Sequence, residues 1–188
     1  MPPTITLNVA QPAETEMLVL LLEDALSSEP QRREMLADVG LTAYAAFQNA
    51  EIVGAAVMRW GDESEIELLA VGKSRRGQGI GQAIVAEIIE EARRRLVKRL
   101  VVGTGNFSLD NSAFYQKCGF RLSHVRRGYF DAVEPPEFWQ GIRLRDMLVF
   151  DYVLTEQDAQ GINSEARINQ CRGDTRPTPL EVQSRGNL

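Results

Sequence analysis

The stretch at residues 71–81 reads Val71-Gly72-Lys73-Ser74-Arg75-Arg76-Gly77-Gln78-Gly79-Ile80-Gly81. An apolar run that favours a β-strand precedes this basic loop, and apolar residues at helical spacing follow it over residues 80–97. Glycines let backbone N–H groups approach an anion closely, and a helix N-terminus adds partial positive charge. The stretch therefore predicts a strand–loop–helix unit that binds a diphosphate, with a purely structural helix start as the alternative.

Two well-known phosphate-binding motifs do not fit this loop. A P-loop needs a glycine five positions before Gly72, where Glu67 stands. The dinucleotide-binding fingerprint needs a glycine three positions after Gly79, where Gln82 stands. Neither a nucleoside triphosphatase nor a Rossmann-type dehydrogenase is expected.

Composition excludes several classes of protein. The 188 residues carry a net charge of −5, which argues against a nucleic-acid binder. The longest apolar run, Met17–Leu22, is far too short to span a membrane, and the first residues lack the pattern of a signal peptide, so a cytoplasmic protein is expected. Two cysteines far apart and one histidine, His124, predict neither a disulfide framework nor a metal site.

The remaining sequence predicts a mixed α/β fold. Strands are expected over residues 4–9, 41–47, 52–58, 63–71, 99–103, 120–126 and 147–154, and helices twice within 11–39, at 80–97 and from about 108 to 117. Residues 1–154 form one predicted domain. Residues 155–188 are polar and are interpreted as a tail outside the fold.

Two motifs resemble those of the GCN5-related N-acetyltransferase (GNAT) superfamily. Arg76-x-x-Gly79-x-Gly81 resembles its (Gln/Arg)-x-x-Gly-x-(Gly/Ala) signature, and residues 111–120 resemble its late helix-and-strand signature. The resemblance implies an acyl-CoA N-acyltransferase fold, in which a mixed sheet splays open at its centre and helices flank it.

The resemblance also implies a binding site for acetyl-CoA and a reaction that needs no metal. The implied contacts are the backbone of Leu69 and Val71 with the pantetheine arm; Arg76, Gly77, Gln78, Gly79, Ile80 and Gly81 with the pyrophosphate; Asn106 and Asn111 with pantetheine or phosphates; and, more weakly, Lys73 and Lys117 with the 3′-phosphate.

Three residues are predicted to be catalytic. Tyr115 matches the family tyrosine that protonates the departing CoA thiolate, with a buried core aromatic as the alternative. Glu65 and Glu67 stand two apart on a strand and should share a face, opposite Ile66 and Leu68. Either carboxylate could deprotonate an amine, with Glu67 preferred, or both could simply face water.

The resemblance implies direct attack of a primary amine on acetyl-CoA in a ternary complex, with the oxyanion held by the backbone N–H of Val71. The acceptor is expected to be a small amine that resembles an aminoglycoside, a polyamine or an amino acid. A protein or peptide acceptor, or a non-catalytic acyl-CoA sensor, remains open. The Pro-rich loop at residues 134–147 could border the acceptor, act as a spacer or form a homodimer contact.

Overall fold

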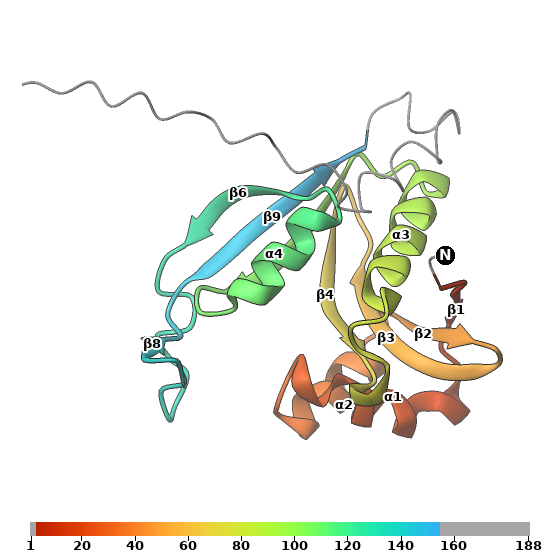
Figure 1. The fold of residues 1–188 in the computed structure, drawn as a ribbon, viewed down its shortest axis with the longest axis horizontal. Coiled ribbons are helices and arrows are strands. Elements are labelled where there is room, and N and C mark those ends of the chain that lie inside the picture. The colour runs from red at the N-terminus through yellow and green to blue at the C-terminus, as the bar shows by residue number, and fades with distance from the viewer. Residues whose placement is uncertain (1–2, 155–188) are drawn as a thin grey trace, which may run out of the picture.

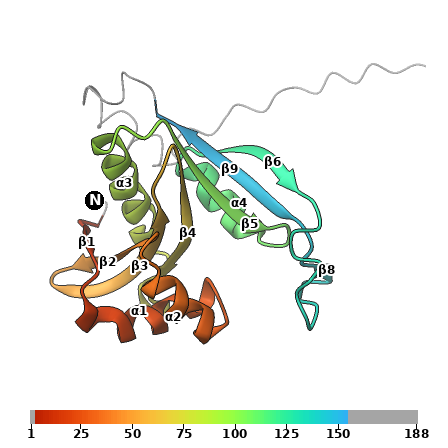
Figure 2. The same cartoon turned by 180° about the vertical axis from the view of Figure 1, so that it is seen from behind.

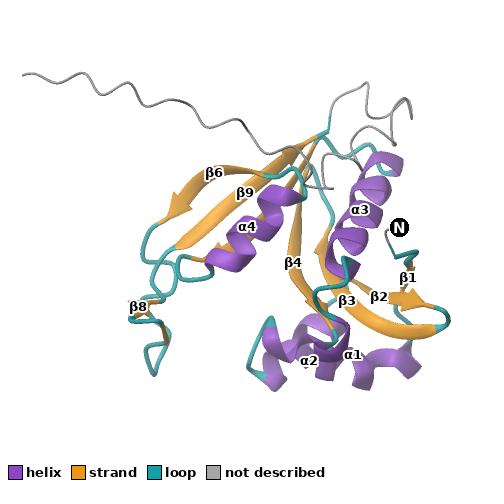
Figure 3. Cartoon of the chain, viewed as in Figure 1, coloured by secondary structure: helices purple, strands orange, loops and turns teal. Residues whose placement is uncertain are grey.

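The computed structural model describes residues 3–154, so the expected tail at 155–188 lies outside the described residues. Seven strands form one mixed sheet in the order β1-β2-β3-β4-β5-β9-β6 (Figures 1 and 3). The strands of the sheet are β1 (Thr6–Val9), β2 (Thr42–Gln48), β3 (Glu51–Arg59), β4 (Glu63–Val71), β5 (Arg99–Gly105), β6 (Arg121–Arg126) and β9 (Met147–Val153). The helices are α1 (Thr15–Leu21), α2 (Glu29–Ala37), α3 (Ile80–Arg94) and α4 (Leu109–Lys117).

The predicted α/β architecture and order of elements are confirmed, with small differences at the boundaries. Helix α3 ends three residues earlier than expected, because Leu96 has a φ of 57° and cannot continue a right-handed helix. A two-stranded ribbon of β7 (Phe138–Trp139) and β8 (Ile142–Arg143) lies in the Pro-rich loop and was not predicted. Strands of two residues are too short to produce a detectable sequence period.

Two apolar cores hold the sheet. Helices α3 and α4 pack on one face, where Ile84 and Ile88 of α3 and Phe150 of β9 are fully buried or nearly so. Leu18 and Leu22 pack on the other face, against β2, β3 and β4 only. Among residues 3–154, therefore, no helix lies on the face of β5, β9 and β6 that is turned away from α4 (Figure 2).

The sheet opens at its centre. Strands β4 and β5 are parallel and pair from Glu63–Arg99 only as far as Ile66–Val102. Beyond that point β4 continues to Val71 along β3, and β5 continues to Gly105 along β9. The two strands diverge there, as Figure 2 shows. The last five residues of β4 consequently have a strand neighbour on one side alone.

Candidate active site

The unpaired edge of β4 presents backbone groups. Gly72 donates its N–H to the carbonyl of Val53 on β3 at 2.9 Å. Because backbone groups alternate in direction along an antiparallel strand, Val71 and Leu69 direct theirs away from β3. The side chain of Arg76 uses this edge, with Nε donating to the carbonyl oxygen of Val71 at 3.1 Å. Both predicted pantetheine contacts therefore lie on the open side of β4.

The glycine loop ends at an uncapped helix. Gly77 and Gly79 have φ values of 73° and 79°, a region that disfavours residues with a Cβ, and Gly79 is the N-cap of α3. The first helical bond runs from Ala83 to Gly79, so the N–H groups of Ile80 and Gly81 have no helical acceptor. Glycines with positive φ followed by a helix N-terminus direct backbone N–H groups to one place and so form an anion-binding geometry.

The basic side chains of this loop are paired with carboxylates. Arg75 binds Glu51, Arg76 binds Asp24, and Lys73 lies 3.6 Å from Glu23 and 3.5 Å from Asp24. Arg76 also lowers the pKa of Asp24, chiefly by hydrogen bonding to it. The backbone N–H groups of the loop are therefore the main groups free to bind an anion, because its basic side chains already pair with carboxylates.

A pocket adjoins the start of this loop. Its volume is about 350 Å³, and it lies between α1, the turn that follows α1 and the end of β4. Its lining includes Met17, Leu20, Leu21, Asp24, Val71 and Gly72. Leu20 is 69% exposed although it is apolar, so this wall of the pocket is hydrophobic and open to a ligand.

A β-bulge corrects one expectation about β4. Glu67 is an extra residue between the pairs Val57–Leu68 and Met58–Ile66. The bulge places Ile66 in the core beneath α3 and Leu68 in the core beneath α1, so these two residues do not share a face. Glu65, opposite Ile66, therefore lies on the same face as Leu68.

The two candidate bases differ in their electrostatics. Burial, together with the neighbouring negative charge of Glu67, raises the pKa of Glu65 above the ordinary glutamate value. Arg126 and Arg59 oppose that rise in the pKa of Glu65 by their positive charges. Glu67 is held instead in an ion pair, in which Arg59 Nε donates to Oε1 at 2.6 Å. The raised pKa makes Glu65 a better proton acceptor than an ordinary glutamate.

Tyr115 lies on the buried side of α4. Its ring packs at centroid distances of 5.1 Å from Phe114 and 5.9 Å from Phe120. Burial raises the pKa of Tyr115, and the nearby thiol of Cys118 adds to the rise. The phenol therefore stays protonated at neutral pH, which a proton donor requires, and at the same time it fills core space.

The structure separates the two candidate asparagines. Asn106 Nδ2 donates to the carbonyl of Arg143 at 3.0 Å, and its Oδ1 accepts the N–H groups of Arg145 at 2.8 Å and Asp146 at 3.1 Å. The side chain thus fastens the segment before β9. Asn111 Nδ2 lies 3.5 Å from Thr104 Oγ1, a weak bond that leaves its amide available.

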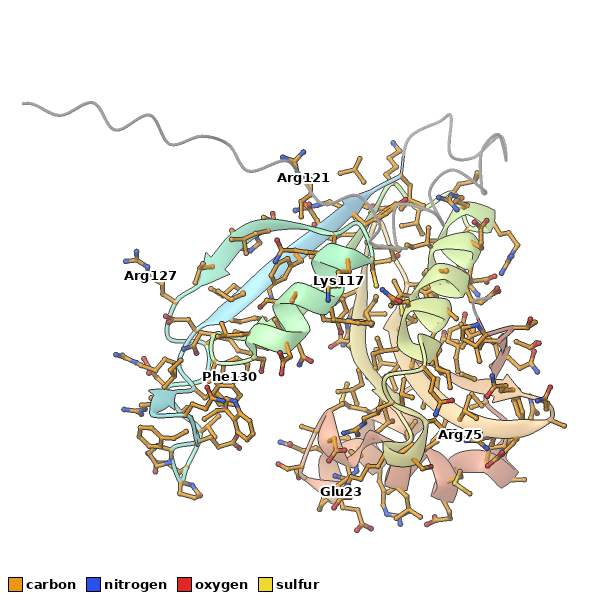
Figure 4. The ribbon with its side chains drawn as sticks, in the orientation of Figure 1. Glu23, Arg75, Lys117, Arg121, Arg127 and Phe130 are labelled. Atoms are coloured by element: carbon orange, nitrogen blue, oxygen red, sulfur yellow. The ribbon has the colours of Figure 1, made fainter. Side chains whose placement is uncertain are left out.

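Two arginines near the candidate base were missed by sequence reasoning. Arg59 pairs in register with Glu65, and Arg126 lies close enough to act on its charge. Their positions depend on strand pairing and on bulges, for which a single sequence carries little signal. Lys117, a candidate for the 3′-phosphate, is exposed at the end of α4 (Figure 4). Within residues 3–154, no helix is long and apolar enough to cross a membrane, and no three His, Cys, Asp or Glu side chains form a metal cluster.

Comparison with known proteins tests the resemblance. The family model described as "Acetyltransferase (GNAT) family" matches residues 13–120. The uncharacterized N-acetyltransferase YvbK of Bacillus subtilis is 32% identical over 108 residues, which cover 56% of this chain and 70% of that protein.

Two solved structures agree with this match. A GNAT family acetyltransferase from Elizabethkingia anophelis, with acetyl-CoA bound, is 31% identical with a TM-score of 0.69 over 80% of this chain and 98% of that chain. A Bacillus subtilis acetyltransferase in complex with CoA is 28% identical with a TM-score of 0.73 over 81% and 100%. These relatives confirm the expected fold and the expected class of enzyme, an acyltransferase. Because the family model matches more than half of the sequence, the chain belongs to the acetyltransferase (GNAT) family.

Proposed function

We propose that this protein transfers an acetyl group from acetyl-CoA to a primary amine by direct attack in a ternary complex. One observation carries the proposal. The unpaired edge of β4 at Leu69 and Val71 runs directly into a glycine loop and the uncapped N-terminus of α3. This arrangement supplies hydrogen bonds for an extended amide-containing arm, followed at once by a site for its pyrophosphate. Residues 1–154 are the proposed acetyltransferase domain.

The binding roles follow from the backbone. N–H and C=O groups of Leu69 and Val71 pair with the amides of the pantetheine arm, as a neighbouring strand would. N–H groups along residues 76–81 hold the pyrophosphate. Because Arg76 already occupies the Val71 carbonyl, we expect its side chain to shift when the arm binds. Within the part of the chain that the structure describes, the side-chain amide of Asn111 has one weak hydrogen bond, so Asn111 is the better of the two asparagines for a cofactor contact.

Glu65 is the proposed base. Its raised pKa and half-buried position suit a carboxylate that removes a proton from an ammonium group. The freed amine nitrogen attacks the thioester carbonyl carbon and forms a C–N bond. The backbone N–H of Val71, on the open side of β4, stabilises the developing oxyanion. Glu67, with Arg59, sets the local charge around the base.

Tyr115 is the proposed acid. The attacking nitrogen of the tetrahedral intermediate loses its second proton to water. The carbonyl then re-forms from the oxyanion, and the C–S bond breaks with its electron pair on sulfur. A proton from the Tyr115 hydroxyl neutralises the CoA thiolate as it leaves. The protonated state that this role needs is the state that burial favours.

Calorimetric titration of the full chain with acetyl-CoA tests the cofactor site, and thiol release with an amine panel tests turnover. We expect saturable binding near one site per chain and amine-dependent CoA release. Binding without release for any amine or peptide would favour an acyl-CoA sensor. A folded protein that does not bind acetyl-CoA would contradict the proposal as a whole.

A further inference from the structure

The face of the sheet turned away from α4 carries a row of charged side chains over β4, β5, β9 and β6. Arg99 of β5 bonds Glu63 at 2.5 Å, Asp151 at 2.8 Å and Ser123 at 3.1 Å, and so joins all four strands. Glu65 shares this face. Glu65 is only partly buried, and no helix of the described residues lies on this face beside β5, β9 and β6 (Figure 2). We therefore expect an acceptor to approach the proposed base from this face.

A second β-bulge brings Arg126 to the same face. The register of β6 and β9 shifts between Leu122 and His124. After the shift, Val125 pairs with Leu148, which packs on the core beneath α3 and α4. Arg126, the next residue, pairs with Met147 and therefore points to the opposite face, on which no helix of residues 3–154 lies beside β5, β9 and β6.

Arg126 differs from most arginines of the fold. Among residues 3–154, nine other arginines, including Arg59 and Arg99, form ion pairs with carboxylates. Within the described residues, the side chain of Arg126 forms neither a hydrogen bond nor an ion pair within 4.0 Å, although the residue is partly buried. Arg121 and Arg127, in contrast, are exposed and point into solvent (Figure 4). A guanidinium without a carboxylate partner, on a residue that is partly buried, is a ready site for an anion.

Glu65 therefore lies near charges of both signs, but its two positive neighbours differ in whether a carboxylate already pairs with them. Arg59 is neutralised by Glu67 at 2.6 Å. The positive charge of Arg126 is close enough to influence Glu65, yet no hydrogen bond joins the two side chains. A ligand that places a cation on Glu65 and an anion on Arg126 would satisfy both.

We propose that Arg126 binds an anionic group of the acceptor, so that the acceptor is an amine that also carries a carboxylate or a phosphate. This inference rests on the proposed function and narrows its acceptor class. Polyamines and aminoglycosides carry no anionic group, so they would leave Arg126 unpaired, and the positive charge of Arg126 would repel their ammonium groups. Arg126 determines specificity and takes no part in proton transfer.

Matched acceptors test the inference with the full chain. Acetyl-CoA-dependent thiol release is measured for L-methionine against L-methioninamide, and for glucosamine 6-phosphate against glucosamine. We expect the anionic member to react with at least tenfold higher kcat/KM in one pair, and which pair responds distinguishes carboxylate from phosphate. Spermidine serves as the acceptor without an anion. If neutral or purely cationic amines match or exceed the anionic ones, or if no anionic amine reacts, the inference is wrong.

Two variants separate specificity from folding. Arg126→Gln should raise KM for the preferred anionic acceptor about tenfold to a hundredfold, with little change for its neutral partner. Arg127→Gln, one position along and exposed, is the matched control and should leave both unchanged. Equal losses on both acceptors in Arg126→Gln would indicate a structural role and overturn the inference. Acetyl-CoA binding by calorimetry is the independent readout, and its absence in the parent protein would instead refute the proposed function.

Discussion

Ile66 and Leu68 lie two positions apart on β4, yet they pack into different cores on opposite faces of the sheet. The extra residue between them, Glu67, interrupts the pairing with β3. Just beyond Ile66 the parallel pairing with β5 also ends. The bulge and the opening of the sheet thus coincide, and Glu65 and Glu67 lie where the unpaired edge of β4 begins, which is where the proposed function puts the acyl group. This coincidence identifies Glu65 and Glu67 as the residues to test first.

Glu65→Gln should lower kcat by about a hundredfold to ten-thousandfold, since it removes the proposed base. In the parent protein, kcat/KM should rise with pH through a pKa above the ordinary glutamate value, because the base must be deprotonated to act. The variant should lack this rise. The measurement is a pH profile of thiol release at saturating acetyl-CoA.

Glu67→Gln is the comparison variant, and it should lose less activity, because Glu67 is already paired with Arg59. Stability gives a separate check on Glu65→Gln. A folded-state pKa above the unfolded value means that stability falls as pH rises between the two values, so Glu65 opposes folding at pH 7. The variant should melt no lower than the parent. A larger activity loss in Glu67→Gln would assign the base to Glu67.

Tyr115→Phe should reduce turnover by about a hundredfold or more while acetyl-CoA binding and the melting temperature stay close to those of the parent. The phenyl ring keeps the contacts with Phe114 and Phe120, so the core is preserved. Turnover from thiol release and binding from calorimetry are compared on the same preparation. Full turnover in this variant would leave Tyr115 as a core aromatic and nothing more.

Much of the fold follows from local pattern, because the long elements have clear periods. Residues 63–71 alternate or run apolar over nine positions, and residues 80–94 repeat their apolar side chains at helical spacing. The boundaries of β4 match the expectation at both ends. The glycine loop could be placed between this strand and this helix, because glycines at alternate positions are a distinctive sequence pattern.

The details that shape the candidate site depend on contacts distant in sequence. The bulge at Glu67 arises from pairing with β3, and the residue type at position 67 does not predict a bulge. The side chain of Asn106, a predicted acetyl-CoA contact, also forms hydrogen bonds to a segment almost forty residues later, which the sequence did not indicate. The side of the sheet on which Arg126 lies is set by another register shift, in the pairing of β6 with β9. A single sequence shows neither the partner strand nor its register, so these positions were beyond local reasoning.

Asn106→Ala and Asn111→Ala should separate structure from cofactor binding. Asn106→Ala removes three hydrogen bonds to the segment before β9 and should cost about 1–3 kcal/mol of unfolding free energy. Asn111→Ala loses one weak bond and should cost less than about 0.5 kcal/mol, yet it should weaken acetyl-CoA binding. Denaturant unfolding and calorimetry measure the two effects. The reverse pattern would return the cofactor contact to Asn106.

Gly79→Ala tests the loop as an anion site. A left-handed φ of 79° at the N-cap of α3 strains any residue with a Cβ, so the substitution should cost about 1 kcal/mol of unfolding free energy. Space is not the obstacle, since the nearest atom to the new Cβ is Pro3 Cδ at 3.5 Å. Relief of the strain would turn the N–H groups at the helix start away from the pyrophosphate, and we expect acetyl-CoA affinity to fall at least tenfold.

Gly61→Ala is the matched control for that variant. Gly61 lies in the turn before β4 with no left-handed φ, and a Cβ there would meet only the Glu63 carbonyl at 3.7 Å. Its stability and acetyl-CoA affinity should stay near those of the parent. If Gly79→Ala loses stability but binds acetyl-CoA as tightly as Gly61→Ala does, the loop glycines serve only the turn. The pyrophosphate must then be held elsewhere, with Lys73 and Lys117 the first side chains to test.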